Sequence, residues 1–299
     1  MTLEEKIRAG RFVVTTELTP PKGTDLGELL SRAESLRGHV DAINLTDSPR
    51  ARMTVEPKSV GRLLLERGIE PIVQITARDR NRIAIQADIL GASVLGIRNL
   101  VFMGGDPPQK GDHPDARGVF DLTAAGMLEA ARGLMQGHDL AGNPLRGAPE
   151  LFLGATANPG AADLAAEVEN TRRKIEAGAQ FLQTQAIYEA SPLERFLEAL
   201  RADGVAVLAG VIPLKSAKMA AWLNANVPGV HVPEALFTEM QTAADEGQEA
   251  ARGIEIAARI VRTVRPLCAG VHLMTLGWEE HIPQILRSAG ILSSSAGSL

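Results

Sequence analysis

The sequence predicts a single α/β domain, a (β/α)8 TIM barrel over residues 1–299. Short apolar runs rich in Val, Ile, Leu and Thr alternate along the whole chain with segments whose apolar residues recur at helical spacing. No shift in composition divides the chain, and its length suits one barrel. A doubly wound sheet is the alternative, because it also alternates strands with helices.

Each expected strand is a short apolar run that ends at Gly, Pro or polar residues. In chain order the expected strands are residues 12–18, 40–45, 71–76, 99–103, 151–156, 181–185, 205–212 and 270–276. The expected helices are residues 25–36, 55–67, 82–95, 123–134, 161–177, 192–200, 216–224 and 279–286. A helical insertion, residues 233–264, precedes the last strand and is broken near Glu246-Gly247. Residues 136–149 read as a polar loop, and residues 293–299 are expected to fray.

The composition is that of an ordinary soluble protein with an aliphatic core: 45% of residues are hydrophobic, 22% charged and only 3% aromatic. A net charge of -5 argues against a nucleic-acid partner. No apolar run approaches the ~18 residues of a membrane span, and no signal peptide is recognisable, so a cytoplasmic protein is expected.

Cysteine and histidine give no metal signal. Cys268 is the only cysteine, which excludes an intrachain disulfide and a cysteine-built zinc or iron–sulfur site. The histidines lack the HxxxH and HxH spacings of metal ligands, and His272, within an apolar strand, is expected to be a core residue.

Polar residues stand at the carboxyl ends of several expected strands, and in a barrel these ends meet at one mouth. They are Glu17, Thr46, Gln74, Asp106, Asn158 and Gln185. Asp106 follows the strand Leu100–Met103 and the pair Gly104-Gly105, which permits a sharp turn, although Asp is also common in ordinary turns. Their convergence predicts an active site.

Two of these residues suggest specific chemistry. Glu17 lies late in an apolar strand, and a carboxyl that stays protonated near neutral pH can serve as a general acid. The alternative is an exposed Glu at the strand edge. Gln185 shares a strand face with Gln183, and its amide can read the edge of a heterocycle or bond to a loop backbone.

Asn170, Arg173 and Lys174 lie three or four residues apart on one expected helix and therefore share a face. Together they could hold a pyrophosphate, or they could form a solvated helix surface. The chain has neither a P-loop nor a GxGxxG motif, and Gly104-Gly105 fits neither spacing.

Four segments, in this order, resemble the methylenetetrahydrofolate reductase family. They are TELTPPK at residues 16–22, GDPP at 105–108, NTRRKIEAGAQF at 170–181 followed by Thr184-Gln185, and GVHLMTL at 270–276. The resemblance implies a (β/α)8 barrel that holds FAD at its mouth. It also implies reduction of 5,10-methylenetetrahydrofolate to 5-methyltetrahydrofolate with NADH or NADPH, a step of one-carbon metabolism and methionine biosynthesis, in a homo-oligomer.

The resemblance also assigns roles. Glu17 would be the general acid that protonates N10 of the folate, Asp106 would be a catalytic residue beside flavin and pterin, and Gln185 would bind the pterin. Residues matching the flavin contacts are Thr46, Gln74, Gly105, Asp106, Asp121, Asn158, Asn170, Arg173 and Lys174.

Several positions depart from the family pattern. Gly104, Gln74 and Asn158 replace an Arg, a His and a Tyr; Ala217 is nearest to the Phe that clamps the folate; and Gly277-Trp278 displaces an Arg. Two variants of the function therefore stay open: a flavin-binding subunit that receives electrons from a partner protein, and a flavin-independent folate reductase. An unrelated barrel lyase that uses Glu17 and Asp106 is a third alternative.

Overall fold

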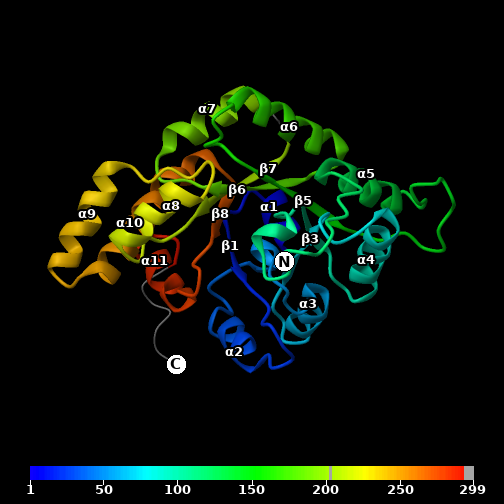
Figure 1. Cartoon of the computed structure of the whole chain (residues 1–299), viewed down its shortest axis with the longest axis horizontal. Coiled ribbons are helices and arrows are strands. Elements are labelled where there is room, and N and C mark those ends of the chain that lie inside the picture. Colours follow the sequence, from blue (N-terminus) through cyan, green and yellow to red (C-terminus); the bar gives the residue numbers. More distant parts are fainter. Residues whose placement is uncertain (202–203, 293–299) are drawn as a thin grey trace.

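Eight parallel strands close into a barrel in the order β1 to β8, with β8 paired to β1 (Figure 1). The computed structural model describes residues 1–201 and 204–292. The closed order confirms the (β/α)8 prediction and excludes the doubly wound sheet. The single domain predicted over residues 1–299 and the frayed tail include residues outside this described part.

The strands lie close to the predicted positions. They are β1 (Val13–Leu18), β2 (Ala42–Leu45), β3 (Pro71–Thr76), β4 (Asn99–Met103), β5 (Phe152–Ala157), β6 (Phe181–Ala186), β7 (Ala206–Val211) and β8 (Gly270–Leu273). The last strand was predicted to reach Leu276, but the ladder ends at Leu273. Leu276 has a φ of 52°, which turns the chain out of the strand direction.

Helices surround the strands (Figure 1). They are α1 (Leu3–Arg8), α2 (Gly27–Ser35), α3 (Pro57–Leu65), α4 (Arg82–Val94), α5 (Ala124–Met135), α6 (Leu164–Ala177), α7 (Ala190–Leu200), α8 (Ala217–Asn226), α9 (Glu234–Asp245), α10 (Glu249–Val264) and α11 (Ile282–Ser288). The described residues also form the 3-10 turns η1 (Pro49–Ala51), η2 (Pro108–Lys110), η3 (Arg265–Leu267) and η4 (Glu279–His281). The predicted insertion is α9 and α10, which separate at Gly247, where φ is 67°.

Helix α1 was not predicted from the sequence. Thr2 and Glu5 form a capping box at its start, and Leu3 is fully buried. Leu3 joins the innermost barrel residues Phe152 and Phe181, whose rings stack with centroids 4.8 Å apart. This helix therefore closes the amino-terminal end of the barrel.

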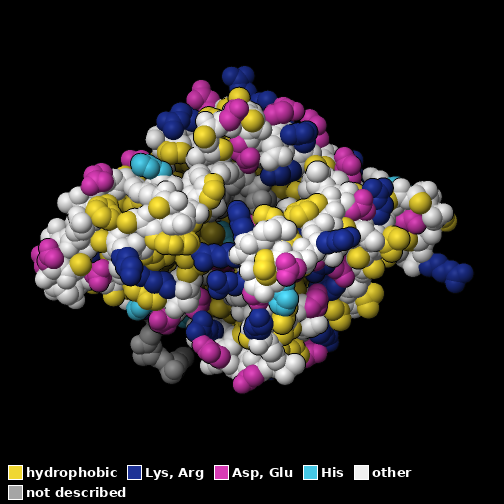
Figure 2. Space-filling view, viewed as in Figure 1, with side chains coloured by type: hydrophobic (Ala, Val, Ile, Leu, Met, Phe, Trp, Pro, Cys, Tyr) yellow, Lys and Arg dark blue, Asp and Glu magenta, His cyan; other side chains and the backbone are white. Residues whose placement is uncertain are grey.

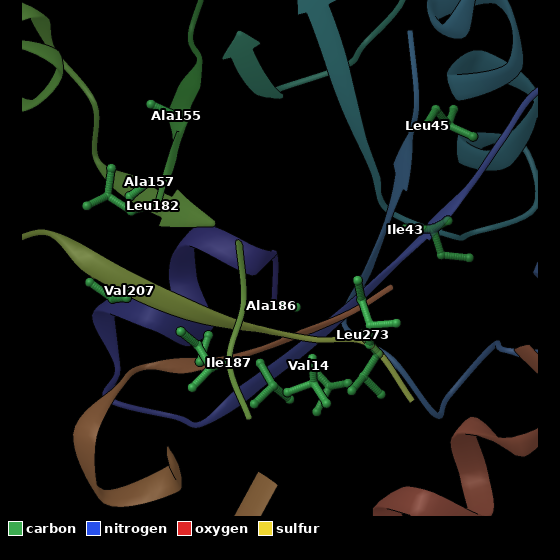
Figure 3. Close-up of a cluster of buried hydrophobic side chains, with 14 of the residues drawn as sticks. Val14, Ile43, Leu45, Ala155, Ala157, Leu182, Ala186, Ile187, Val207 and Leu273 are labelled. Carbon is green, nitrogen blue, oxygen red and sulfur yellow. The ribbon is translucent and has the colours of Figure 1, made fainter. Parts of the chain in front are cut away.

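Alternate strand residues face opposite sides, as the pleat requires. One set, including Val14, Ile43 and Leu182, lies in the main core (Figure 3). Apolar residues of the surrounding helices belong to the same core. The other set faces the barrel axis. It begins with an apolar layer around Phe181 and continues with polar residues toward the carboxyl ends of the strands. The pleat therefore brings polar side chains to the mouth.

Within residues 1–201 and 204–292, no helix is long and apolar enough to cross a membrane. The same part of the chain holds no group of three His, Cys, Asp or Glu residues arranged to bind a metal ion.

Candidate active site

A cavity of about 1190 Å³ opens at the carboxyl ends of the strands. Its lining includes six residues predicted for the site: Glu17, Thr46, Gln74, Asn158, Lys174 and Gln185. No Phe, Tyr or Trp of the described residues lines it, and its largest unbranched apolar side chains are Met53, Met103 and Met274. The cavity thus joins a polar floor to flexible thioether side chains that can adapt to a flat ring.

A buried polar layer lies directly beneath this cavity. The side-chain amides of Asn44 and Gln183 bond to each other, with distances of 2.7 and 3.1 Å. The Oγ1 atom of Thr15 lies 2.9 Å from Nδ1 of His272, and Nε2 of Gln183 lies 3.4 Å from the same nitrogen. All four side chains are buried. Because their polar groups bond to one another, these side chains are held in fixed positions and form the floor of the cavity.

Glu17 stands on this floor. It shares the inward strand face with Val13 and Thr15, and one of its carboxylate oxygens lies 3.7 Å from Nε2 of His272. Its side chain is 19% exposed, and it also lines a second cavity of about 320 Å³ beside the first. Glu17 is therefore a carboxyl within reach of a ligand. His272 is the core residue that the sequence predicted, but its second nitrogen faces this carboxyl.

Gln185 lies where β6 departs from regular pairing with β7. Its Oε1 accepts a hydrogen bond from the backbone N–H of Ala186 at 3.0 Å. Its Nε2 donates no hydrogen bond to any described residue, so this group is available to a ligand. Gln183, predicted to share a face with Gln185, lies in the buried layer below.

The predicted helix face on α6 divides between the cavity and solvent. Lys174 is 7% exposed, lines the cavity and donates from Nζ to the carbonyl of Thr156 at 2.7 Å. Burial lowers the pKa of Lys174, and the nearby Glu167 opposes this shift. Arg173 is exposed and outside the cavity lining. Only one of the two cations predicted for a pyrophosphate therefore faces the cavity.

Asn158 carries an unsatisfied acceptor. Its backbone N–H donates to Glu167, but its buried Oδ1 is without a hydrogen-bond partner. The side chain packs beneath Gly229, where a β-carbon would collide with the Asn158 amide at 2.1 Å. An unpaired buried acceptor in the wall of a cavity is a natural contact for a ligand donor.

Five predicted contacts lie outside the cavity lining: Gly105, Asp106, Asp121, Asn170 and Arg173. The Asp106 side chain is 45% exposed and pairs with Lys110 at 3.6 Å. Asp121 pairs with Arg82 at 2.9 Å, and this hydrogen-bonded guanidinium holds the pKa of the carboxyl well below its usual range. Gly105, with φ at 85°, turns the chain at the end of β4. Asp106, which its position after a strand predicted for the mouth, therefore lies outside the cavity lining, and its catalytic role stays a prediction.

Two arginines after β3 were missed as site supports, although they stand in the charged turn of residues 77–81. Arg78 is 3% exposed and donates to the carbonyl of Ser48 at 3.1 Å. Arg80 pairs with the buried Asp47 at 2.7 Å. Both hold the loop after β2 against the loop after β3. The charged residues of this turn, directly after a strand, were the sequence feature that could have indicated their role.

Comparisons with known proteins agree with the sequence resemblance. A family model described as "Methylenetetrahydrofolate reductase" matches residues 2–290. "5,10-methylenetetrahydrofolate reductase" of Pectobacterium carotovorum is 26% identical over 292 residues, which cover 94% of this chain and 91% of that protein. "Methylenetetrahydrofolate reductase 2" of Schizosaccharomyces pombe is 24% identical over 307 residues, which cover 97% of this chain. This chain spans about half the length of the yeast relative, 47%.

Among solved structures, an uncharacterised protein from Clostridium thermocellum, described as binding two copies of 5-methyl-5,6,7,8-tetrahydrofolic acid, has a TM-score of 0.64. It is 15% identical, and the match covers 97% of this chain and 98% of that one. At this identity the likeness concerns the fold alone.

Proposed function

The chain belongs to the methylenetetrahydrofolate reductase family, and we propose that it reduces 5,10-methylenetetrahydrofolate to 5-methyltetrahydrofolate. The substrate gains one hydride and one proton, and NADH or NADPH is oxidised to NAD⁺ or NADP⁺. The observation that carries this proposal is the position of Glu17, a carboxyl at the floor of a large cavity and 3.7 Å from His272.

In this proposal Glu17 is the general acid. Its proton goes to N10 of the folate as the bond between N10 and the bridging methylene carbon breaks. The electron pair of that bond leaves with N10, and a cationic iminium forms between N5 and the methylene carbon. The carboxylate left behind is an anion next to this cation and stabilises it. Hydride addition to the methylene carbon then gives the methyl group.

The substrate would lie with its pterin ring toward Gln185. The unused Nε2 of Gln185 is a donor for a pterin acceptor. The side chains of Met103 and Met274 supply apolar contacts for the ring faces. A solved structure of similar fold is described as binding 5-methyl-5,6,7,8-tetrahydrofolic acid, which supports a folate as the ligand.

FAD is the cofactor that the family implies, and part of the residue set fits it. Thr46, Gln74, Asn158 and Lys174 line the cavity and would hold the cofactor through a hydroxyl, two amides and an ammonium group. The unpaired Oδ1 of Asn158 is the contact most in need of a donor. Bound FAD would supply hydride transfer between the nicotinamide and the folate.

The five expected contacts that lie outside the cavity favour a second candidate function. In that variant the nicotinamide passes its hydride directly to the folate, and Thr46, Gln74 and Lys174 contact the dinucleotide instead of a flavin. A flavin-binding subunit reduced by a partner protein is the other variant. A cytoplasmic location and a homo-oligomer stay predictions.

The visible spectrum of the purified protein, recorded before and after addition of FAD and then of NADH without oxygen, separates these functions. Flavin bands that NADH bleaches support the flavin-dependent reductase. Bands that neither NADH nor NADPH bleaches support the subunit that needs a partner. No bands even after FAD is added, together with NADH-dependent formation of 5-methyltetrahydrofolate, support direct transfer. Absence of any 5-methyltetrahydrofolate product with NADH, NADPH and a chemical electron donor would refute the proposed activity.

A further inference from the structure

The rim of the cavity carries two cations from one short segment, Arg50 and Arg52. We propose that the rim segment, residues 48–52, binds the anionic outer end of a ligand whose reactive ring lies at the cavity floor. The ligand group is a carboxylate or phosphate: the glutamate tail of a folate or the diphosphate of a nicotinamide dinucleotide. This inference rests on the proposed function.

Charge pairing leaves these two arginines available. The cavity lining holds the cations Lys22, Arg50, Arg52 and Lys174 and the anions Glu17, Asp112 and Glu167. Lys22 pairs with Asp112 at 2.6 Å. Neither Arg50 nor Arg52 has a carboxylate partner within 4.0 Å among the described residues. In Figure 2, Lys and Arg side chains gather near the centre of the face shown.

The backbone that presents these arginines is strained. Ser48, Arg50 and Ala51 have φ values of 46°, 55° and 55°, in the left-handed region that residues with a β-carbon rarely adopt. Three such residues within four positions persist only where the surrounding structure enforces them, and such strain gathers at ligand clamps. An ordinary solvated loop would relax.

The surrounding structure enforces this shape from three sides. Buried Arg78 donates to the carbonyl of Ser48. Asp47, which precedes the segment, is 5% exposed and accepts from the backbone and hydroxyl of Thr76 at 2.9 and 2.8 Å. Gly111 lies against Ala51 so closely that a β-carbon there would stand 1.8 Å from the Ala51 carbonyl oxygen.

Arg50 also contacts a helix from another part of the barrel. Its guanidinium carbon lies 4.8 Å from the centre of the Trp222 ring, on α8, whereas the rim segment follows β2. A cation–π contact holds the guanidinium over one ring face and leaves its N–H groups free to bind an anion. Trp222 is 40% exposed, so this contact lies at the surface of the mouth.

The chemistry of the two reactants fits this arrangement. A folate has its reacting pterin at one end and its glutamate carboxylates at the other, and a nicotinamide dinucleotide has a diphosphate beyond its reacting ring. Either ligand, with its ring near Glu17, would extend its anionic part outward along the cavity. Two planar guanidinium groups can bind such oxygens with paired, charge-assisted hydrogen bonds.

Ligand affinity in the double variant Arg50→Ala/Arg52→Ala tests the proposal. Calorimetry would use three probes: 5-methyltetrahydrofolate with one glutamate, the same folate with three glutamates, and ADP-ribose. We expect at least one anionic probe to bind about tenfold more weakly. Loss confined to the triglutamate assigns the rim segment to the folate tail, and loss confined to ADP-ribose assigns it to the dinucleotide. Arg50→Lys/Arg52→Lys should retain part of the affinity.

Arg146→Ala is the matched control, since Arg146 is exposed, has no ion pair within the described part of the chain and lies outside the cavity lining. Salt dependence in the unchanged protein is a second measurement that needs no variant, and affinity should fall as ionic strength rises. If every variant bound all three probes with the same affinity, within about twofold, the proposed anion-binding role of the rim segment would be wrong, and the proposed function would be unaffected. Failure of every probe to bind the unchanged protein would overturn the proposed function together with it.

A spectroscopic readout reports on the same contact without catalysis. Trp222 and Trp278 are the only tryptophans, so Trp278→Phe leaves Trp222 as the single reporter beside Arg50. The anionic probe that binds the rim segment should change Trp222 emission in Trp278→Phe. The change should disappear when Arg50→Ala is added, and its persistence there would contradict a contact with Arg50.

Discussion

Nε2 of His272 lies 3.7 Å from a carboxylate oxygen of Glu17, at the boundary between the buried polar layer and the cavity. The other ring nitrogen of His272 lies 2.9 Å from the hydroxyl of Thr15. One imidazole therefore joins the fixed floor of the barrel to the carboxyl that we propose as the acid. His272 is in this account a positioning residue for Glu17.

Replacement of His272 tests this positioning role. His272→Leu should lower kcat by about 10- to 100-fold with little change in KM, because a misplaced acid slows the reaction more than it weakens binding. His272→Gln keeps a polar atom toward Glu17 and should recover most of the rate. Steady-state kinetics and thermal unfolding of both variants would be compared. If kcat followed thermal stability alone in the two variants, His272 would be only a core residue.

A second prediction follows from the different positions of Lys174, which lines the cavity, and Arg173, which is exposed to solvent. Lys174→Met should lower the cofactor content that survives dialysis by about tenfold, because it removes the buried cation from the cavity wall. Arg173→Met is the matched control on the same helix and should retain the cofactor, since Arg173 is exposed. Flavin absorbance after dialysis, or dinucleotide affinity if no flavin binds, measures both. Equal losses in the two variants would contradict the division that the structure gives.

Asp106→Asn tests whether Asp106 is a catalytic residue, as the sequence predicts, or an exposed carboxylate outside the cavity, as the structure places it. A carboxylate beside the reacting groups would lose a large part of the rate when its charge is removed. A half-exposed carboxylate paired with Lys110 should instead change the rate of folate reduction by less than about threefold. Rapid-mixing kinetics of the folate step distinguishes these two outcomes. A loss of about 100-fold would place Asp106 against the ligand during the reaction and contradict the geometry described above.

Strand positions could be predicted from the sequence because parallel strands, buried on both faces, read as nearly continuous apolar runs. The polar residues that interrupt those runs were equally informative. Glu17 and Gln185 stand in phase with the inward-facing residues of their strands, so the period of two placed both at the mouth. Helix α1, with only six residues, is too short to give a periodic signal.

The remaining parts of the site depend on loop geometry that no local pattern specifies. Asp106 follows a strand as predicted, but the turn at Gly105 and the bond from Arg78 to the Asp106 carbonyl decide where its side chain lies. The buried layer of Asn44, Gln183 and His272 joins residues 139 and 89 positions apart, and such pairings become visible only in the folded barrel.

The rate of folate reduction by Glu17→Gln tests the central claim most directly. An amide fills nearly the same space but delivers no proton, and general acids contribute roughly 10²–10⁴-fold to a rate. We predict that formation of 5-methyltetrahydrofolate in rapid-mixing experiments falls by that amount, while calorimetry gives an unchanged affinity for 5-methyltetrahydrofolate, whose binding needs no proton transfer. A Glu17→Gln protein that reduces the folate at the unchanged rate would contradict the account, as would a loss of rate explained entirely by weaker binding.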